Sequence, residues 1–384
     1  MLALKLLHLQ RMKLLVQPAD GAAPLIAGID GARISIEILI FRFDRRDVET
    51  ALVNAVSRGV AVRALIAYTN RGGERSLRAL EMRLLAAGVT VARTDDDLVR
   101  YHGKMMIVDG RELYLMAFNL TKLDIDRSRS FAVIVDDKET VQEAIKLFDA
   151  DSRRVRYTPG LDTFVVSPLN ARKLLMDFIN GAKHQLLIYD PAVADPMMIR
   201  ALQERAKAGV EIKLLGRLFR KVPTIQVHKL FIRLHTRMML RDGEDVFIGS
   251  QSLRTAELDA RREVGLIFQD PKIAARLIKT FQEDWKESLN GKAPPEDADP
   301  AAEPLPPEKV AKKVAKAVTK AMPPVAPVLE VVVRKMVGTE TEVDVNPAEL
   351  EAAVKDAVKN AIQEAVSEAV EQAEEAAEEA ARES

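Results

Sequence analysis

The chain has 384 residues, enough for two core-forming domains, and its 57 basic and 57 acidic side chains balance to no net charge. The absence of cysteine excludes disulfide frameworks and thiolate catalysis, and it is compatible with a reducing cytosol. The sequence contains no run of about 18 apolar residues. We therefore expect a cytoplasmic protein without a membrane span, whose contact with a bilayer would be peripheral.

The charges are unevenly distributed along the chain. Residues 291–384 carry 11 Lys and Arg against 20 Asp and Glu, so the body before them is correspondingly basic. A basic body suits an anionic substrate or partner, without specifying which one.

The first 18 residues, MLALKLLHLQRMKLLVQP, are apolar but interrupted by Lys5, His8, Arg11 and Lys13. They lack the continuous apolar region and the cleavage site of a signal peptide. We predict a packed first helix or strand here, with an amphipathic helix at a membrane surface as the alternative.

An internal duplication organises the body of the chain. Segment 29–41 (IDGARISIEILIF) resembles 179–191 (INGAKHQLLIYDP), and 51–66 (ALVNAVSRGVAVRALI) resembles 201–216 (ALQERAKAGVEIKLLG). Each block has the pattern of a helix end, an apolar strand, a helix, a glycine turn and a second strand. Helices that alternate with strands predict an α/β sandwich with a largely parallel core sheet.

Four regions follow from this pattern. We place the two halves at 15–155 and 160–290, a Pro/Ala-rich linker with a short helix at 291–346, and an Ala/Glu-rich acidic helix at 347–384. The last helix has Asn346 as its N-cap candidate. Binding of a protein partner, self-association and a solvated, partly disordered helix all stay open for it.

One strand-like stretch of the first half carries polar side chains at fixed spacing. In YHGKMMIVDG (101–110), Lys104 follows His102 by two residues and Asp109 follows Lys104 by five. Side chains two apart on a strand point to the same face, so His102 and Lys104 should meet. A single stretch of this kind is more often structural than catalytic, so the interpretation depends on a second copy.

The second half contains that copy. In RLHTRMMLRDG (233–243), Arg237 follows His235 by two residues and Asp242 follows His235 by seven. Both copies share a Met-Met pair and end in an Asp-Gly turn signal. We therefore treat His102, Lys104 and Asp109, together with these three, as candidate catalytic residues.

Two histidines from duplicated halves can face each other across one phosphate. One imidazole can attack phosphorus, and the other can protonate the leaving oxygen and then deprotonate the incoming water or alcohol. Lys104 and Arg237 would bind the phosphate oxygens. This chemistry requires neither a metal nor another cofactor.

The motif His-x-Lys-x4-Asp, twice in a duplicated α/β chain, resembles that of the phospholipase D superfamily, which includes phospholipases, cardiolipin synthases and nucleases. The resemblance covers about residues 15–290 and leaves the tail unexplained. It implies a duplicated phospholipase D-type α/β sandwich, a phosphohistidine intermediate, and no metal or cofactor. It also implies a Gly-Ser-x-Asn segment after each motif and an acidic residue further on.

The second half matches that pattern incompletely. IGSQSL supplies Gly249 and Ser250, with Ser252 in place of Asn, and Glu263 follows further on as the acidic residue. We assign Ser250 and Ser252 to phosphate binding.

The first half has lost different parts of the pattern. LMAFNLT keeps Asn119, a further phosphate-binding candidate, but has Met116 and Ala117 in place of Gly-Ser. Ser130 stands as far after His102 as Glu263 stands after His235, at the position where the resemblance implies an acid.

These differences suggest an asymmetric site. The role implied for the acid is to fix the histidine tautomer, so we expect Glu263 to orient His235, and Ser130 to serve His102 less well. We select His235 as nucleophile and His102 as general acid and base. The opposite assignment, which is usual in the superfamily, is kept as the alternative.

Three functions stay open. The first is a phosphodiesterase that hydrolyses or transfers phosphatidyl groups of a phospholipid or acts on another phosphodiester. The second is a nuclease, which the basic body fits equally well, although a single tryptophan, Trp285, argues against base stacking. The third is a degraded binding or scaffold module, which the changes at Ala117, Ser130, Arg237 and Ser252 favour.

Overall fold

The structure is a computed structural model of the whole chain, and we describe it at residues 12–68, 74–289, 355–358, 360, 361 and 365. The chain divides into two units, Met1–Pro295 and Glu296–Ser384. In the second unit the described residues are helical, within the expected helix 347–384. The expected linker and short helix at 291–346 lie outside the described residues, as do residues 1–11.

The first half of the chain builds a mixed sheet with strand order β4-β3-β2-β6-β7-β8-β1. β2, β3 and β4 pair in parallel, and every pair from β2–β6 to β8–β1 is antiparallel. The strands are β1 (Lys13–Gln17), β2 (Ser35–Ile40), β3 (Ala61–Ile66), β4 (Thr90–Arg93), β6 (Met105–Val108), β7 (Glu112–Met116) and β8 (Ser128–Val135). The start of the described chain is thus a packed strand, as predicted.

The second half repeats this topology in the order β12-β11-β10-β14-β15-β17-β9. Again the first two pairs are parallel and the remaining four are antiparallel. The strands are β9 (Phe164–Val166), β10 (Gln185–Val193), β11 (Glu211–Leu218), β12 (Gln226–His228), β14 (Arg237–Arg241), β15 (Asp245–Gly249) and β17 (Val264–Gln269). Equal strand order in both sheets confirms the duplicated α/β sandwich.

The prediction of a largely parallel core sheet is wrong. β6 follows His102 and runs antiparallel to β2, and β14 follows His235 and runs antiparallel to β10. Each then turns directly back into the next strand, β7 or β15. A tight Asp-Gly turn joins antiparallel strands only, because a parallel connection needs a long crossover. The turn signals at 109–110 and 242–243 therefore already argued for hairpins.

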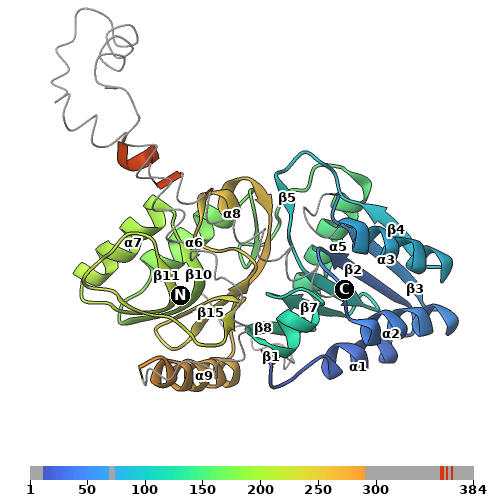
Figure 1. The fold of residues 1–384 in the computed structure, drawn as a ribbon, viewed down its shortest axis with the longest axis horizontal. Coiled ribbons are helices and arrows are strands. Elements are labelled where there is room, and N and C mark those ends of the chain that lie inside the picture. Colours follow the sequence, from blue (N-terminus) through green and yellow to red (C-terminus); the bar gives the residue numbers. More distant parts are fainter. Residues whose placement is uncertain (1–11, 69–73, 290–354, 359, 362–364, 366–384) are drawn as a thin grey trace, which may run out of the picture. The chain divides into compact units, whose positions relative to one another are not determined.

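Helices cover both outer faces, so that unit 1 has helical layers outside two facing sheets (Figure 1). Helices α1 to α4 pack on the first sheet, α6 to α8 pack on the second, and α5 and α9 contribute to the core between the sheets. The helices are α1 (Ala23–Gly31), α2 (Arg46–Ser57), α3 (Glu74–Ala86), α4 (Lys122–Asp126), α5 (Lys138–Arg153), α6 (Ala171–Asn180), α7 (Pro196–Lys207), α8 (Thr255–Asp259) and α9 (Pro271–Leu289).

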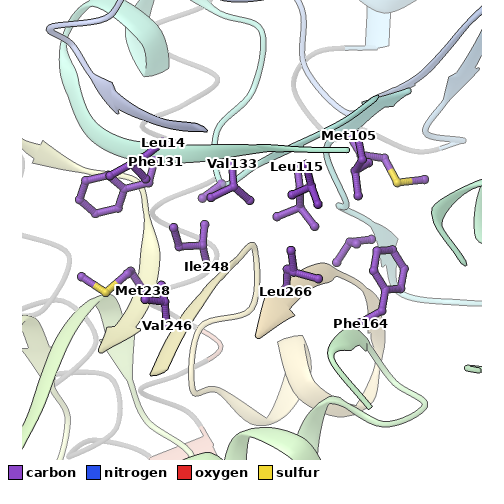
Figure 2. Close-up of a cluster of buried hydrophobic side chains, with 14 of the residues drawn as sticks. Leu14, Met105, Leu115, Phe131, Val133, Phe164, Met238, Val246, Ile248 and Leu266 are labelled. Carbon is purple, nitrogen blue, oxygen red and sulfur yellow. The ribbon is translucent and has the colours of Figure 1, made fainter. Parts of the chain in front are cut away.

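The two sheets meet through their apolar inner faces. Figure 2 shows Leu115 and Val133 of the first sheet facing Ile248 and Leu266 of the second. All four are buried within one continuous cluster. Burying an aliphatic side chain of this size contributes about 1.5–3 kcal/mol relative to leaving it exposed. The interface between the halves is therefore a core of the protein, and it fixes the position of one motif relative to the other.

The paired methionines divide between layers. Met105 and Met238 point into the core between the sheets, whereas Met106 and Met239 pack under the outer helices. This alternation is the period-two pattern of a strand buried on both faces. The shared Met-Met pairs are therefore core residues.

Two short strand pairs cross between the halves. β5 (Arg100–Tyr101) pairs in parallel with β16 (Arg261–Arg262), and β13 (Arg233–Leu234) pairs in parallel with residues 128–129 of β8. Moving the first-half residues of one pairing forward, and its second-half residues back, by the spacing between the two motifs gives the other pairing. The halves are thus related by a pseudo-twofold relationship, and each histidine segment lies on the opposite half. No helix among the described residues is long and apolar enough to span a bilayer.

Candidate active site

The backbone at His102 is held by the second half. The His102 N–H donates to the carbonyl oxygen of Arg262 (2.7 Å) at the end of the β5–β16 pair. Next to it, a Cβ on Gly103 would lie 2.8 Å from the Val264 side chain, which leaves no space for a side chain here. The ring of Phe41 meets the imidazole edge-on at 4.5 Å between centroids. These contacts fix the direction of the His102 ring.

The imidazole of His102 lies between an acid and a cation. Its Nδ1 is 2.9 Å from both carboxylate oxygens of Glu263. Its Nε2 is 2.7 Å from Nζ of Lys104, which also donates to the His102 carbonyl oxygen (2.6 Å). A carboxylate accepts and an ammonium donates, so the network assigns the proton to Nδ1 and the lone pair to Nε2. The expected meeting of the His102 and Lys104 side chains is confirmed, although residues 102–104 lie between β5 and β6 and not within the expected strand.

The expectation that Glu263 orients His235 is wrong. Glu263 belongs to the second half but contacts His102 of the first, because the β5–β16 pairing carries it across the interface. Its counterpart Ser130 likewise crosses to the other motif, where its hydroxyl donates to the His235 carbonyl oxygen (3.3 Å). No pattern within either half indicated that these pairs cross.

Burial sets the protonation of this group. Burial, followed by the charges of Lys104 and Arg237, holds the pKa of His102 well below its usual value. Burial also lowers the pKa of Lys104 to about 7 and raises the pKa of Glu263. A low pKa keeps the His102 imidazole neutral near pH 7, and a neutral imidazole is the nucleophilic form.

The second histidine is held in the reciprocal way. The His235 N–H donates to the carbonyl oxygen of Arg129 on β8 (3.1 Å). Its Nδ1 lies 3.5 Å from Oδ2 of Asp124, a first-half residue at the start of α4. Burial lowers the pKa of His235 well below its usual value, and the charge of Asp124 opposes that effect. Each imidazole thus faces a carboxylate of the opposite half.

Asp124 was not among the predicted residues. It follows His102 at the same distance along the chain at which Glu257 follows His235. Applying the spacing between the two motifs to every buried acid would have found this pair. The resemblance implied an acid only at the positions of Ser130 and Glu263, so Asp124 was not predicted.

Arg237 is anchored by residues of its own half. Its Nε donates to Oγ of Ser252 (3.0 Å), and its Nη2 is 3.7 Å from Oε1 of Glu257. The same carboxylate oxygen lies 3.7 Å from Arg254 Nη1 and 3.3 Å from Arg261 Nη1. All five side chains are buried. Arg254 and Arg261, which no sequence motif indicated, therefore share the Glu257 carboxylate with Arg237.

The other two phosphate-binding candidates differ in their contacts. Ser250 donates through Oγ to the Val264 carbonyl (3.3 Å) and accepts from the Val264 N–H (3.1 Å), so it ties β15 to β17 beside Glu263. Asn119 donates its backbone N–H to Asp124 (2.8 Å), while its buried side-chain Oδ1 has no hydrogen-bond partner among the residues described. Asn119 thus has side-chain capacity left, whereas the Ser250 hydroxyl contacts both the sheet backbone and the Glu263 carboxylate, and that second contact opposes the rise in the pKa of Glu263.

The two motif aspartates lie at the other end of their strands. Asp109 accepts the backbone N–H groups of residues 33–35, and Asp242 accepts those of residues 183–185. Both adopt positive φ (53° and 52°) in the hairpin turns. Their contacts make them turn residues, which contradicts their assignment to the catalytic group.

The site and fold correspond to a known family. A family model described as "Cardiolipin synthase, PLD-like domain" matches residues 25–152 and 217–285, which is just over half of the chain. The chain belongs to this PLD-like family. No group of three or more His, Asp or Glu side chains in the described part of this PLD-like protein could hold a metal ion.

Relatives of this PLD-like protein include two kinds of enzyme. It is 24% identical over 310 residues to polyphosphate kinase 1 of Chlorobaculum tepidum, covering 72% of this chain and 44% of the relative. It is 29% identical over 130 residues to the mitochondrial cardiolipin hydrolase of Danio rerio, covering 33% of this chain and 56% of the relative. The chain spans less than half the length of the polyphosphate kinases.

A solved structure supports the fold assignment. Polyphosphate kinase from Porphyromonas gingivalis superposes with a TM-score of 0.61 at 18% identity, covering 80% of this chain and 55% of that one. The two proteins therefore share the fold. The family and the relatives together support an enzyme of the PLD superfamily.

Proposed function

We propose that this PLD-like protein cleaves phosphodiesters in two steps without a metal, through a phosphohistidine on His102. The observation that supports it is the ordered contact of Glu263 with Nδ1 and of Lys104 with Nε2. This replaces our sequence-based choice of His235 as nucleophile, since the acid that motivated that choice contacts His102. It also weakens the interpretation of a degraded module, because the acid lost at Ser130 is not the acid that His102 uses.

In the first step, Nζ of Lys104 moves from Nε2 of His102 to a phosphate oxygen, and the freed Nε2 lone pair attacks phosphorus and forms a P–N bond. The bond from phosphorus to the leaving oxygen breaks, and its electron pair stays on that oxygen. His235 must be protonated at this point, which burial and the nearby cations oppose and the charge of Asp124 favours. It gives its Nε2 proton to the leaving oxygen and becomes neutral. Glu263 stabilises the positive charge that develops on the His102 ring.

In the second step, neutral His235 removes a proton from water or an alcohol. The resulting oxygen attacks phosphorus, the P–N bond breaks, and its electron pair returns to Nε2 of His102. Both histidines are then back in their starting protonation states. Water gives hydrolysis and an alcohol gives group transfer, so both outcomes share the same intermediate.

Cationic side chains of both halves stabilise the charge on the phosphate. The charges of Lys104 and Arg237 lower the pKa of both histidines, which supports a shared site for the four groups. Fixed cations in a buried site stabilise the extra charge of a pentacoordinate phosphate without reorganisation. We assign Lys104 and Arg237 to the phosphate oxygens, with the side-chain amide of Asn119 as a further donor.

We propose a phosphatidyl group as the group transferred, supported by the description of the family model and by the similarity to a cardiolipin hydrolase. Phosphoryl transfer from polyphosphate is the second candidate, because the relatives that match 72% of this chain are polyphosphate kinases. DNA stays an alternative diester substrate, in keeping with the basic body.

Trapping the intermediate tests the proposal. Wild type, His102→Asn and His235→Asn would be mixed with bis-nitrophenyl phosphate in excess EDTA, quenched, and analysed by intact mass and peptide mapping. Nitrophenolate leaves without a proton, so His235→Asn should form the adduct on His102 and fail to hydrolyse it. His102→Asn should form none. An adduct on residue 235 in the His102→Asn variant would reverse the assignment.

The natural substrate is tested in the same assay. Vesicles of cardiolipin or phosphatidylglycerol, single-stranded DNA, and polyphosphate would each be offered to the wild type in EDTA and quenched during turnover, because an alkoxide leaving group needs the proton of His235. The mass of the trapped group distinguishes phosphatidyl, nucleotidyl and phosphoryl adducts, and we expect the phosphatidyl adduct. If none of these nor the nitrophenyl ester gave turnover by the wild type, the enzymatic proposal would be wrong.

A further inference from the structure

We infer that Asp124 is the positioning residue of His235: it holds the imidazole through Nδ1 and thereby directs Nε2 to the leaving oxygen. The inference rests on the proposed function, in which His235 is the general acid and base. It assigns to the first half an acid at a position other than the one the motif pattern implies.

The carboxylate of Asp124 is fixed by the fold. Asp124 is in the first turn of α4, where its N–H donates to the N-cap hydroxyl of Thr121 (3.2 Å). Its Oδ2 accepts the N–H of Asn119 (2.8 Å), and its Oδ1 accepts Nη1 of Arg233 (2.7 Å). The residue is 2% exposed. Two contacts hold the carboxylate and a third holds the backbone of the same residue, so the position of the carboxylate is fixed.

That position faces His235. Oδ2 of Asp124 lies 3.5 Å from Nδ1, and within the described part of the chain this buried nitrogen makes no hydrogen bond. A buried imidazole nitrogen without a partner loses its hydration without compensation. Catalytic contacts often shorten when the reacting complex forms, so an approach of a few tenths of an ångström completes the bond. The geometry points to an Nδ1–H donated to Asp124 in the protonated ring.

Comparison with the second half shows that the contact between the acid and a histidine is specific to Asp124. Glu257, the counterpart of Asp124, also accepts the backbone N–H of the residue five positions before it, Ser252. Its other oxygen pairs with the guanidinium groups of Arg237, Arg254 and Arg261, and none of these partners is a histidine. The contact with the backbone N–H five residues before the acid is therefore common to both halves, while the contact with a histidine belongs to Asp124.

Asp124 also gives the His235 ring the carboxylate that Ser130 lacks. The hydroxyl of Ser130 is directed to the backbone carbonyl of His235, so it leaves the ring without an acid from that position. His102 receives its acid from the opposite half at the motif position, Glu263, whereas His235 receives its acid from an earlier position of the opposite half. Each histidine thus has one carboxylate from the opposite half, although the two acids stand at different distances along the chain from their motifs.

The charges around His235 explain why an acid is needed. Burial lowers its pKa, and Arg233, Arg237 and Lys104 lower it further, whereas Asp124 raises it. A general acid must carry its proton when the leaving group departs. Asp124 therefore favours the protonated form against the three cations.

Leaving-group dependence tests the inference. Asp124→Asn keeps an oxygen that can accept the Asn119 N–H, so the fold should persist, but it removes the charge. For a diester with an alkyl leaving group, which requires protonation, we expect kcat to fall by about 10- to 100-fold. For the nitrophenyl ester, adduct formation should change less than about threefold, because the leaving group needs no proton. Equal losses with both substrates would overturn the inference.

The pH profile gives a second readout. Loss of Asp124 lowers the pKa of His235, so the alkaline limb of kcat/KM should move to lower pH by about one unit. Asp124→Glu, which keeps the charge, should leave the limb near its wild-type position. Glu283→Gln, at an exposed glutamate of α9, is the control and should leave the limb at its wild-type position. A limb that moves equally in Asp124→Glu and Asp124→Asn would show a structural role only.

NMR separates failure of this inference from failure of the proposed function. The titration of ¹⁵N-labelled His235 can be followed in the full-length protein without any substrate, in wild type and in Asp124→Asn. A lower pKa in the variant supports the contact even if no substrate were turned over. An unchanged pKa overturns it even if the enzyme proves active.

Discussion

Both carboxylate oxygens of Glu263 lie 2.9 Å from Nδ1 of His102, although the two residues are 161 positions apart and belong to different halves. Asp124 and His235 form the reciprocal pair across the same interface. Neither half can therefore assemble an oriented histidine alone. The apolar core between the sheets is thus a requirement of the site as well as of stability.

Replacing Glu263 tests the orientation of the nucleophile. In Glu263→Gln the amide can present its NH₂ to Nδ1 and stabilise the wrong tautomer, with the proton on Nε2. We expect adduct formation on His102 to slow by about 10²- to 10⁴-fold, the range found when an orienting carboxylate is lost. Single-turnover release of nitrophenolate measures it.

The matched control is Glu283→Gln, at an exposed glutamate of α9. It should form the adduct at the wild-type rate. If Glu263→Gln also did so, the contact with Nδ1 would have no role in the formation of the intermediate.

The sequence predicted the parts of the fold that repeat locally. Apolar strands followed by amphipathic helices recur at a fixed offset, which was enough to recognise two α/β halves. The pattern did not separate parallel from antiparallel neighbours, because a strand buried on both faces has the same apolar composition in either direction. The hairpin turns at Asp109 and Asp242 contained the missing information.

The sequence predicted the contacts of the site that residues close together in the chain make with each other. Spacing of two residues correctly brought Lys104 to His102. The partners of both imidazoles come instead from the opposite half, and a contact across 161 positions depends on the pseudo-twofold relationship between the halves. Sequence periodicity contains no information on such pairings, so Glu263 was matched to the wrong histidine and Asp124 was missed.

Lys104 should make stability depend on pH. Burial lowers its pKa to about 7 in the folded protein, whereas an unfolded chain keeps it near about 10.4. Between these values the unfolded state binds the additional proton, so the free energy of unfolding rises with pH. Below pH 7 both states are protonated, and the full cost of the buried charge is present.

We therefore compare wild type with Lys104→Met by urea denaturation between pH 7.5 and 9.5. The free energy of unfolding of wild type, relative to the variant, should rise by about 1 kcal/mol per pH unit. Lys122→Met, at an exposed lysine of α4, is the control. Parallel curves for wild type and Lys104→Met would contradict the assigned pKa.

Asp109 should affect stability and not chemistry. An alanine at φ 53° would adopt the left-handed region at a cost of about 1–2 kcal/mol and would leave the N–H groups of residues 33–35 without their acceptor. We expect Asp109→Ala to lose about 2–3 kcal/mol of unfolding free energy. Asp109→Asn, which tolerates this backbone and still accepts, should lose less.

Turnover per folded molecule distinguishes the two roles of Asp109. It should stay within about twofold of wild type in both variants, because the carboxylate serves the turn. A loss of a hundredfold in kcat without a loss of stability would restore the catalytic assignment made from the motif.

Asp284 should be a main determinant of stability at the junction of the halves. It accepts Nε and Nη2 of Arg129 on β8 (2.7 and 2.8 Å) and the hydroxyl of Tyr189 on β10 (2.6 Å), and it is 1% exposed on α9. One carboxylate thus joins three elements from both halves.

Removing the charge of Asp284 leaves the guanidinium of Arg129 largely buried without its bidentate acceptor, which costs about 3–5 kcal/mol. Asp284→Asn should lower the free energy of unfolding by that amount in urea denaturation, while Glu283→Gln, the next residue on the same helix, should change it by less than about 0.5 kcal/mol. Equal effects of the two substitutions would show that the Asp284 contacts contribute nothing beyond the surface charge of α9.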